Sequence, residues 1–434
     1  MRGKINYIFL PFLVISLLTT GCDKKEKPTS KVKLRLPYFS DIRNKPVGEA
    51  IIKAFHISHP SIQIEPIFIT GNYEQKVLTM LAGGDVVDVM VVSSFYMGDY
   101  VEKGTLLNLD PYMEKDGEFQ SFREDIYPAS LEMCKYKGLS YTVPFWANSL
   151  VLFYNKDLFD KEKIGYPDES WDWETLVSAG KKLTKIDENG KISQYGLFAY
   201  FGINDTFGGL YQYIRRNGGN LFNEDMSKCL IGSQESIEAI RWSFDLITKY
   251  KIVPSPFVGD ERMKDYEQAF LSGKAAMTIS GRWSAPLFST AKFNWSCAPI
   301  PKGKVEFKPI GCNLMGAYSK TKHPEECWEF LKFIMGKETQ EIVSKLKSDI
   351  PIRISVANSP EFINWSSMPK ENMVFLEELK QAEGFLHYFP GLKEWLEKAQ
   401  QKLELVLLGK KDLKEACDEI AKEYEENKKS KGEI

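Results

Sequence analysis

The feature that most constrains this fold is an alternation of short apolar runs with amphipathic helical segments over residues 33–92. Residues 33–39 are predicted to form a short strand, and apolar side chains from Val47 to Phe55 then recur at the period of one helix face. A second strand-like run covers 61–69, a second helix follows, and 88–92 is dominated by apolar residues, as a strand buried on both faces requires. This order predicts an α/β fold with a parallel, doubly wound sheet.

Length and charge set the frame for the rest. With 434 residues, the chain is long enough for two domains or one large bilobal one. Its 57 Lys and Arg against 59 Asp and Glu give a net charge of -2, so there is no basic excess and nucleic acid is not an expected partner. Aromatic residues make up 13% of the chain, which favours a site built from ring faces.

Residues 1–21 are predicted to be a signal peptide. A positive start precedes an apolar run at 7–18, and small residues lead to Cys22. The segment resembles a bacterial lipoprotein signal, although Leu18 stands one place earlier than the usual leucine. The resemblance implies that Cys22 carries lipid such as palmitate, and residues 22–31 are too charged to fold and predict a tether. We therefore expect a lipid-anchored protein on the extracytoplasmic face of the cell membrane; simple secretion is the alternative.

The remaining cysteines and histidines indicate no metal site. Six cysteines are widely scattered without a C-x-x-C pair, and the four histidines do not cluster with them. No cofactor motif is present either, so neither a cofactor nor a metal is expected. Disulfides are chemically permitted outside the cytosol, but buried free thiols are the expectation for Cys134, Cys229, Cys297, Cys312, Cys327 and Cys417.

The stretch from Phe270 to Trp283 carries the strongest functional signal. It leads from the end of a helix through a turn at 272–274 into a strand at 275–279, and Gly281 then lets Arg282 and Trp283 emerge at the strand's carboxyl end. Ligands of open α/β sheets bind at such ends. A tryptophan packed in a core is the alternative. The pattern MTI-x-G-x-W resembles a signature of bacterial extracellular solute-binding proteins of the maltose and oligosaccharide type, where this tryptophan stacks on a sugar.

Further blocks extend the resemblance, in order, over nearly the whole mature chain. Residues 73–94 resemble the family's Y-x-x-K block with its A-G-G motif, although Val87 stands where proline is common, and 103–113 resemble the next block. Residues 141–159 resemble a crossing segment ending in Y-N-K-D-L-F. The resemblance implies two doubly wound lobes joined by three crossings. The predicted lobes are 32–147 plus 315–352 and 148–314 plus 353–434.

The first crossing is expected to be irregular at 144–148, where a proline interrupts the pattern, and to become a buried strand at 150–154. A second crossing strand is predicted at 311–318 and a third crossing at 350–353. Tyr195 to Tyr200 is predicted to be a strand, with residues 201–205 at its end as candidate cleft contacts. From 371 to 424 the pattern predicts helix throughout, broken at 389–391.

Candidate ligand-binding residues follow from these positions. Trp146 is expected to cover a ligand face, unless it is wedged in the hinge, and Asn148 falls where relatives place a polar contact. The residues after the strand at 88–92, with Phe95 among them, would face the cleft, although either serine could instead cap a helix. The full predicted set is Tyr38, Ser93, Ser94, Trp146, Asn148, Tyr200, Arg282, Trp283 and Asn313.

Two lobes with a hinge can close on a ligand that touches both. The resemblance therefore implies a monomeric binding protein that captures a sugar or oligosaccharide and delivers it to the membrane permease subunits of an ABC importer, without turnover. A secreted carbohydrate-active enzyme such as a glycosidase, a binding protein for a non-sugar solute, and a surface adhesin remain alternatives. No acid-base motif, nucleophile arrangement or repeat supports the enzyme or the adhesin.

Overall fold

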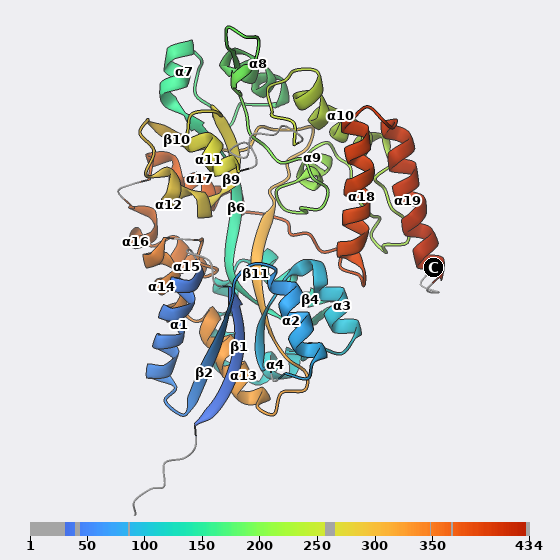
Figure 1. Cartoon of the computed structure of the whole chain (residues 1–434). Helices are drawn as coiled ribbons and strands as arrows, with labels where there is room; N and C mark the ends of the chain where they lie inside the picture. The colour runs from blue at the N-terminus through green and yellow to red at the C-terminus, as the bar shows by residue number, and fades with distance from the viewer. Residues whose placement is uncertain are drawn as a thin grey trace, which may run out of the picture.

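The computed structural model describes residues 31–39, 44–85, 87–256, 265–347, 349–365 and 368–430. Two α/β lobes lie one above the other in Figure 1, and long strands run between them. The predicted signal peptide, Cys22 and all of the tether except Lys31 lie outside the described residues. Among the helices of the described ranges, none has the length and apolar character needed to span a membrane.

The first lobe begins with the predicted strand and helix alternation. Strands β1 (Val32–Phe39) and β2 (Ile62–Ile69) pair in parallel, with α1 (Asn44–Ser58) between them in the chain. Strand β3 (Val89–Val92) begins directly after Asp88, which is hydrogen-bonded to Arg35 of β1. Asp88 N donates to Arg35 O at 3.0 Å, and Arg35 N donates to Asp88 Oδ2 at 2.9 Å. The apolar pattern of residues 33–92 thus folds as an α/β layer, as predicted.

Short helices and a small hairpin complete this lobe. They are α2 (Tyr73–Ala82), η1 (Ser94–Tyr96), α3 (Met97–Glu102), α4 (Asp110–Lys115), α5 (Gly117–Phe122), η2 (Arg123–Asp125), α6 (Pro128–Glu132), β4 (Lys135–Tyr136), β5 (Leu139–Ser140), α13 (Pro324–Met335) and α14 (Lys337–Leu346). The α13 face that carries Trp328, Leu331 and Ile334 is buried. Helix α14 packs against α1 (Figure 1).

Two long strands form the connection between the lobes. Strand β6 (Val143–Asn155) is buried over its whole length and pairs antiparallel with β11 (Ile310–Ala317) at its start. Its later half pairs antiparallel with β9 (Met277–Gly281) and β10 (Trp295–Ala298), while β11 also pairs antiparallel with β3. One antiparallel sheet therefore passes through both lobes, whereas the predicted parallel pairing is found in β1 and β2.

The first crossing differs from the prediction of an irregular segment at 144–148. Residues 143–155 form one continuous strand, and the proline is accommodated by a bulge at which Asn313 pairs with Trp146 and Leu314 with Pro144. A bulge tolerates proline because the extra residue leaves the ladder of hydrogen bonds. The third crossing lies against the first, since Ala147 N donates to Ile350 O at 2.9 Å and Ile350 N donates to Ala147 O at 3.1 Å. The predicted lobe boundaries stay a prediction, because β6 and β11 belong to both lobes.

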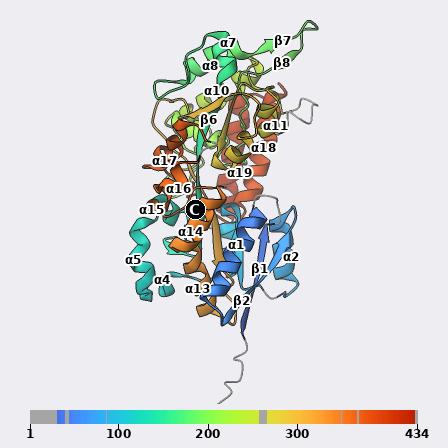
Figure 2. The ribbon, with the colours of Figure 1, turned by 90° about the vertical axis from the view of Figure 1, so that its left-hand side faces the viewer.

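The second lobe carries most of the remaining elements. They are α7 (Lys156–Glu162), α8 (Trp173–Leu183), β7 (Lys185–Ile186), β8 (Ile192–Gln194), α9 (Leu210–Arg216), α10 (Gln234–Thr248), α11 (Tyr266–Leu271), η4 (Arg282–Ser284), α12 (Ala285–Phe288), η5 (Lys370–Met373), α17 (Val374–Leu379), α18 (Leu392–Leu407) and α19 (Leu413–Ser430). Helices α15 (Ile354–Ala357) and α16 (Pro360–Ile363) lie at the level of the crossings (Figure 1) and pack against α14 of the first lobe. The β7 and β8 hairpin lies at the end of the second lobe farthest from β1 and β2 (Figure 2).

Two predictions for this lobe are wrong in detail. Tyr195 to Tyr200 does not form a strand; only Tyr195 and Phe198 make isolated parallel bridges, to Ala275 and Thr278. The segment predicted as helical from 371 to 424 contains most of η5 and three α-helices, and residues 380–391 form a non-helical connection much longer than the predicted break. All six cysteines in the described ranges are free, and all except the half-buried Cys312 are buried, which confirms the expected free thiols.

Candidate functional site

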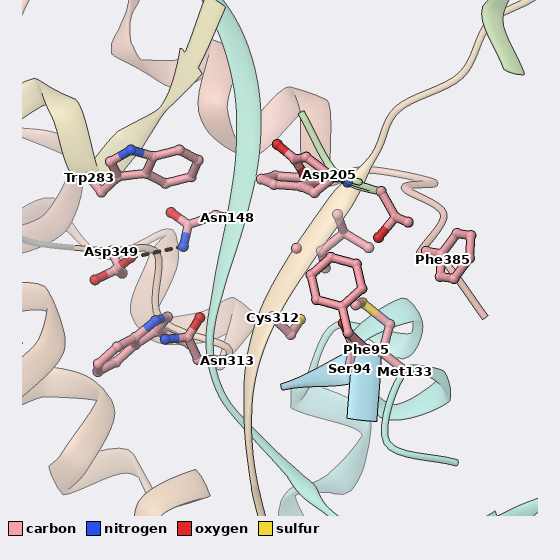
Figure 3. Close-up of a pocket in the computed structure, with 15 residues that line it drawn as sticks. Ser94, Phe95, Met133, Asn148, Asp205, Trp283, Cys312, Asn313, Asp349 and Phe385 are labelled. Atoms are coloured by element: carbon pink, nitrogen blue, oxygen red, sulfur yellow. Dashed lines mark hydrogen bonds between the residues drawn. The ribbon is translucent and has the colours of Figure 1, made fainter. Parts of the chain in front are cut away.

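A cavity of about 360 Å³ lies where the two lobes meet the crossing strands (Figure 3). The first lobe contributes the residues just after β3 and after α6, and the second lobe contributes the loop before α9 and the residue after Arg282. Strands β6 and β11 form the wall between them. The lining residues are Ser94, Phe95, Met133, Trp146, Asn148, Asp205, Thr206, Phe207, Trp283, Ile310, Gly311, Cys312, Asn313, Asp349 and Phe385.

Asn148 presents an unused acceptor to this cavity. The side chain is 6% exposed, and Nδ2 donates to Asp349 Oδ1 at 2.8 Å (Figure 3). A carboxylate accepts and cannot donate, so the NH₂ end of the amide must face Asp349. Oδ1 is then left without a hydrogen-bond partner among the described residues. Because a buried unpaired acceptor costs about 1–3 kcal/mol, Asn148 is prepared for a donor supplied by a ligand.

Asp349 is placed by the third crossing. It directly precedes Ile350, which pairs with Ala147 on β6. Asp349 as a whole residue is 6% exposed. The charge of Asp349 acts on the Arg282 guanidinium, which lies behind the cavity wall. Burial lowers the pKa of Arg282 to about 10, and the charge of Asp349 opposes that shift.

Arg282 does not reach the cavity, contrary to the prediction. The residue is 1% exposed, and its guanidinium lies 4.1 Å from the ring centroid of Phe362 and 5.6 Å from that of Phe375. Stacking on rings compensates a buried guanidinium in part. The backbone after Gly281 turns so that Arg282 points into the packed region between η4, α16 and α17, whereas the next residue, Trp283, faces the cavity.

Trp283 forms a ring surface on the second-lobe side. Its indole folds back over Gly281 so closely that a Cβ there would lie 1.9 Å from Trp283 Cζ3. Nε1 donates to Tyr266 Oη at 2.9 Å, and the ring lies 6.1 Å from that of Phe207 at 50°. The glycine is thus required by the tryptophan ring, and the hydrogen bond fixes the ring's orientation.

Asp205 organises the loop that covers the other side of the cavity. Its Oδ1 accepts hydrogen bonds from Phe207 N and Gly208 N, both at 2.9 Å, which forms a turn before α9. The ring of Phe207 then lies against Gly311 of β11, where a Cβ would stand 3.0 Å from the ring. Of the predicted contacts at 201–205, only Asp205 lines the cavity.

The structure brings Ser94, Trp146, Asn148, Trp283 and Asn313 together at the cavity, along with Phe95. Trp146 is only 1% exposed and packs on Phe145 with ring centroids 3.8 Å apart. It therefore combines the two roles considered from the sequence, since it is packed at the hinge and also contributes to the cavity wall.

Three other predicted residues lie elsewhere. Tyr38 is in the first-lobe core, 1% exposed, with its ring 6.2 Å from that of Phe145 and packed on Gly48, because β1 directs it inward. Tyr200 is 45% exposed and donates to Asn204 Oδ1 at 2.5 Å. Ser93 precedes η1 without a side-chain capping bond and is not part of the lining.

Sequence reasoning missed several cavity residues. Met133, Phe207, Cys312 and Phe385 are single apolar side chains on loops or on β11, and their pattern does not differ from that of core residues. One feature of the sequence could have indicated Asp349 as a cavity residue, namely its position directly before the predicted third crossing. In the described part of the chain, no group of three or more His, Cys, Asp or Glu could hold a metal ion.

A model of the family described as "bacterial extracellular solute-binding protein" matches residues 43–341. The chain belongs to this family. Among the relatives, the galactooligosaccharide-binding protein of Bacillus subtilis is 23% identical over 425 residues, with 95% of each chain covered. A maltooligosaccharide ABC transporter solute-binding lipoprotein of Streptococcus pneumoniae is 24% identical over 302 residues, covering 68% of this chain and 67% of the relative.

The fold agrees with that of solved binding proteins. An ABC substrate-binding protein from Listeria monocytogenes, in complex with cycloalternan, superposes with a TM-score of 0.81 and 25% identity, covering 93% of this chain and 99% of that one. The family resemblance and the two-lobed α/β architecture predicted from the sequence are therefore confirmed.

Proposed function

We propose that this solute-binding protein captures a saccharide in the cavity between its lobes and delivers it unaltered to the permease subunits of an ABC importer. The observation that carries the proposal is the buried Asn148 amide, whose unpaired acceptor faces a cavity with ring surfaces on its walls. Sugars offer hydroxyl donors at their rim and apolar C–H faces, so this combination of acceptor and rings matches them.

The residues proposed to contact the ligand come from both lobes. Trp283 and Phe207 belong to the second lobe, Ser94 and Phe95 to the first, and Asn148 and Asn313 to the crossings. A ligand that contacts both lobes stabilises the closed arrangement by its differential affinity for it. The relatives named for galactooligosaccharide and maltooligosaccharide support a saccharide as the ligand class.

The proposal includes a lipid anchor. The signal-like segment ends at Cys22, and a relative is named as a lipoprotein. A lipidated Cys22 followed by a charged tether of nine residues would hold a monomeric globule within roughly 30 Å of the extracytoplasmic membrane face. That position suits a protein that passes its ligand to membrane-embedded permease subunits.

The test is a thermal-shift screen of the mature protein against a panel of neutral mono- and oligosaccharides, followed by calorimetry on each positive. We expect at least one saccharide to raise the melting temperature in a concentration-dependent way and to bind at one site per chain. Chromatography of the incubated saccharide should return it unchanged. Turnover would favour the secreted-enzyme alternative, and binding of only non-sugar solutes would contradict the saccharide proposal.

A further inference from the structure

The charged side chains of the described cavity lining are all negative. Two carboxylates, Asp205 and Asp349, contribute to the lining, and none of the described lining residues is a Lys, Arg or His. The buried unpaired polar atom of the lining, Asn148 Oδ1, is also an acceptor. Figure 3 labels both carboxylates and this amide around the same cavity. A ligand therefore meets negative charge and acceptors, with no cation in the described wall to neutralise an anion.

The two carboxylates are compensated to different degrees. The Arg282 guanidinium lies close enough to Asp349 for the two charges to interact, so part of the Asp349 charge is balanced from behind the wall. Asp205 makes no ion pair with any described residue. Its Oδ1 accepts from two main-chain N–H groups, and no hydrogen bond from a described residue reaches Oδ2. The uncompensated charge at the cavity is therefore that of Asp205.

Among the described residues, Lys393 brings a cation near the lining residue Phe95. Lys393 Nζ lies 5.3 Å from the ring centroid of Phe95, but Glu397 pairs with it at 3.4 Å. Its charge is thus already balanced by a carboxylate on the same helix. Lys393 therefore does not compensate the charge of Asp205.

We infer that the cavity selects uncharged or amino-bearing saccharides and excludes those that carry carboxylate or phosphate groups, with Asp205 as the residue that sets this preference. The inference rests on the proposed saccharide-binding function and specifies its substrate class. An anionic substituent in a partly desolvated cavity is repelled by Asp205 and finds no cation to pair with. Hydroxyl or ammonium groups instead supply the donors that Asn148 and Asp205 lack.

The experiment compares charge forms of the same saccharide. The probes are maltotriose, galactotriose and cellotriose, each with its uronic-acid and its amino-sugar counterpart, titrated calorimetrically into the wild-type protein. For any backbone that binds, we expect the uronate form to bind at least about 10-fold more weakly than the neutral form, and the amino form to bind as tightly or more tightly. High salt should narrow the difference.

Asp205→Asn isolates the charge, because an asparagine Oδ1 can accept the same two main-chain hydrogen bonds. We expect this variant to reduce the discrimination against uronate severalfold, measured as the ratio of the neutral and uronate affinities of the same variant. Asp168→Asn is the matched control: Asp168 forms a similar turn, accepting from Ser170 N at 2.8 Å, but lies outside the cavity lining, so it should leave the ratio unchanged.

Distinct outcomes would overturn the inference and the proposed function. Equal or tighter binding of a uronate by the wild type, or an unchanged uronate-to-neutral ratio in Asp205→Asn, would overturn the charge preference while leaving saccharide binding intact. Absence of binding by all nine probes would overturn the saccharide proposal and the inference with it. If Asp168→Asn also changed the uronate-to-neutral affinity ratio, the discrimination against uronate would be due to the overall charge of the protein rather than to Asp205.

Discussion

Asn148 donates from Nδ2 to Asp349 Oδ1 at 2.8 Å, although 201 residues separate the two in the chain. One residue lies on the first crossing and the other directly before the third, so the bond joins two of the three segments that connect the lobes. It also fixes which end of the amide faces the cavity. Asp349 is thus a positioning residue for the acceptor that we propose binds the ligand.

Replacement of Asp349 by alanine should weaken saccharide binding about 10-fold, because the amide of Asn148 would no longer be held in one orientation. Calorimetry on the saccharide identified by the screen would measure the loss. Asn148→Ala should cost at least as much, since it removes the acceptor itself.

A double-mutant cycle separates this positioning role from an independent contact. If Asp349 acts through Asn148, the double variant should bind little more weakly than Asn148→Ala alone. Strict additivity of the two losses would contradict the positioning role. Circular dichroism should accompany each measurement, because Asp349 also balances part of the buried Arg282 charge.

Trp283→Ala should cost about 2 kcal/mol or more of binding free energy, because a large ring at the cavity wall is removed. Trp283→Phe keeps a smaller aromatic face and loses the hydrogen bond to Tyr266, so it should bind closer to wild type than Trp283→Ala. Trp242→Ala is a control for general tryptophan loss, since that ring stacks on Trp173 with centroids 4.1 Å apart, outside the cavity lining. An unchanged dissociation constant in folded Trp283→Ala would reject the role.

Gly281→Ala should displace the Trp283 ring, because the added Cβ would lie 1.9 Å from Cζ3. We expect saccharide binding to fall about 10-fold, and the change should also appear in the tryptophan fluorescence. Gly165→Ala is the matched control, as a Cβ there meets nothing within 4 Å. Equal affinities for the two variants would show that the ring tolerates the extra methyl group.

The sequence predicted the site best where main-chain geometry determines the side chain. Gly281 and Trp283 form one local unit, and Asn148 lies on a long buried strand, so spacing along the chain was sufficient to place both at the cavity. Tyr38 and Arg282 do not line the cavity, for a common reason. Which side of a strand or turn faces a cleft depends on the segments that pack against it, and the local sequence does not specify that packing.

Long-range contacts explain the other differences. The antiparallel pairing of β6 with β9, β10 and β11 joins segments more than 100 residues apart, and no local pattern specifies it. The same holds for Phe385, whose loop was predicted to be helical. Its apolar sequence gave no sign that residues 380–391 connect two helices along the cavity.

Cys22→Ser should release the protein from membranes, because lipid attachment requires the thiol of the predicted first mature residue. The variant and the wild type would be expressed in a bacterial host, and membrane and soluble fractions compared by immunoblot. Ser30→Ala in the same tether is a control that should remain with the membranes. Continued sedimentation of Cys22→Ser with membranes would contradict the lipid anchor.

Protonation of His387 should destabilise the protein at acid pH. Burial, with a smaller contribution from the charge of Arg215, lowers the pKa of His387 from 6.5 to about 4, and its ring packs against Phe222 and Phe385. As the pH falls, His387 therefore takes up a proton near pH 6.5 in the unfolded chain but only near pH 4 in the folded chain. Stability should be full above pH 6.5 and fall by up to about 3 kcal/mol towards pH 4. Denaturant unfolding across this range should show a shallower fall for His387→Phe; parallel curves for the two proteins would assign the loss to other groups.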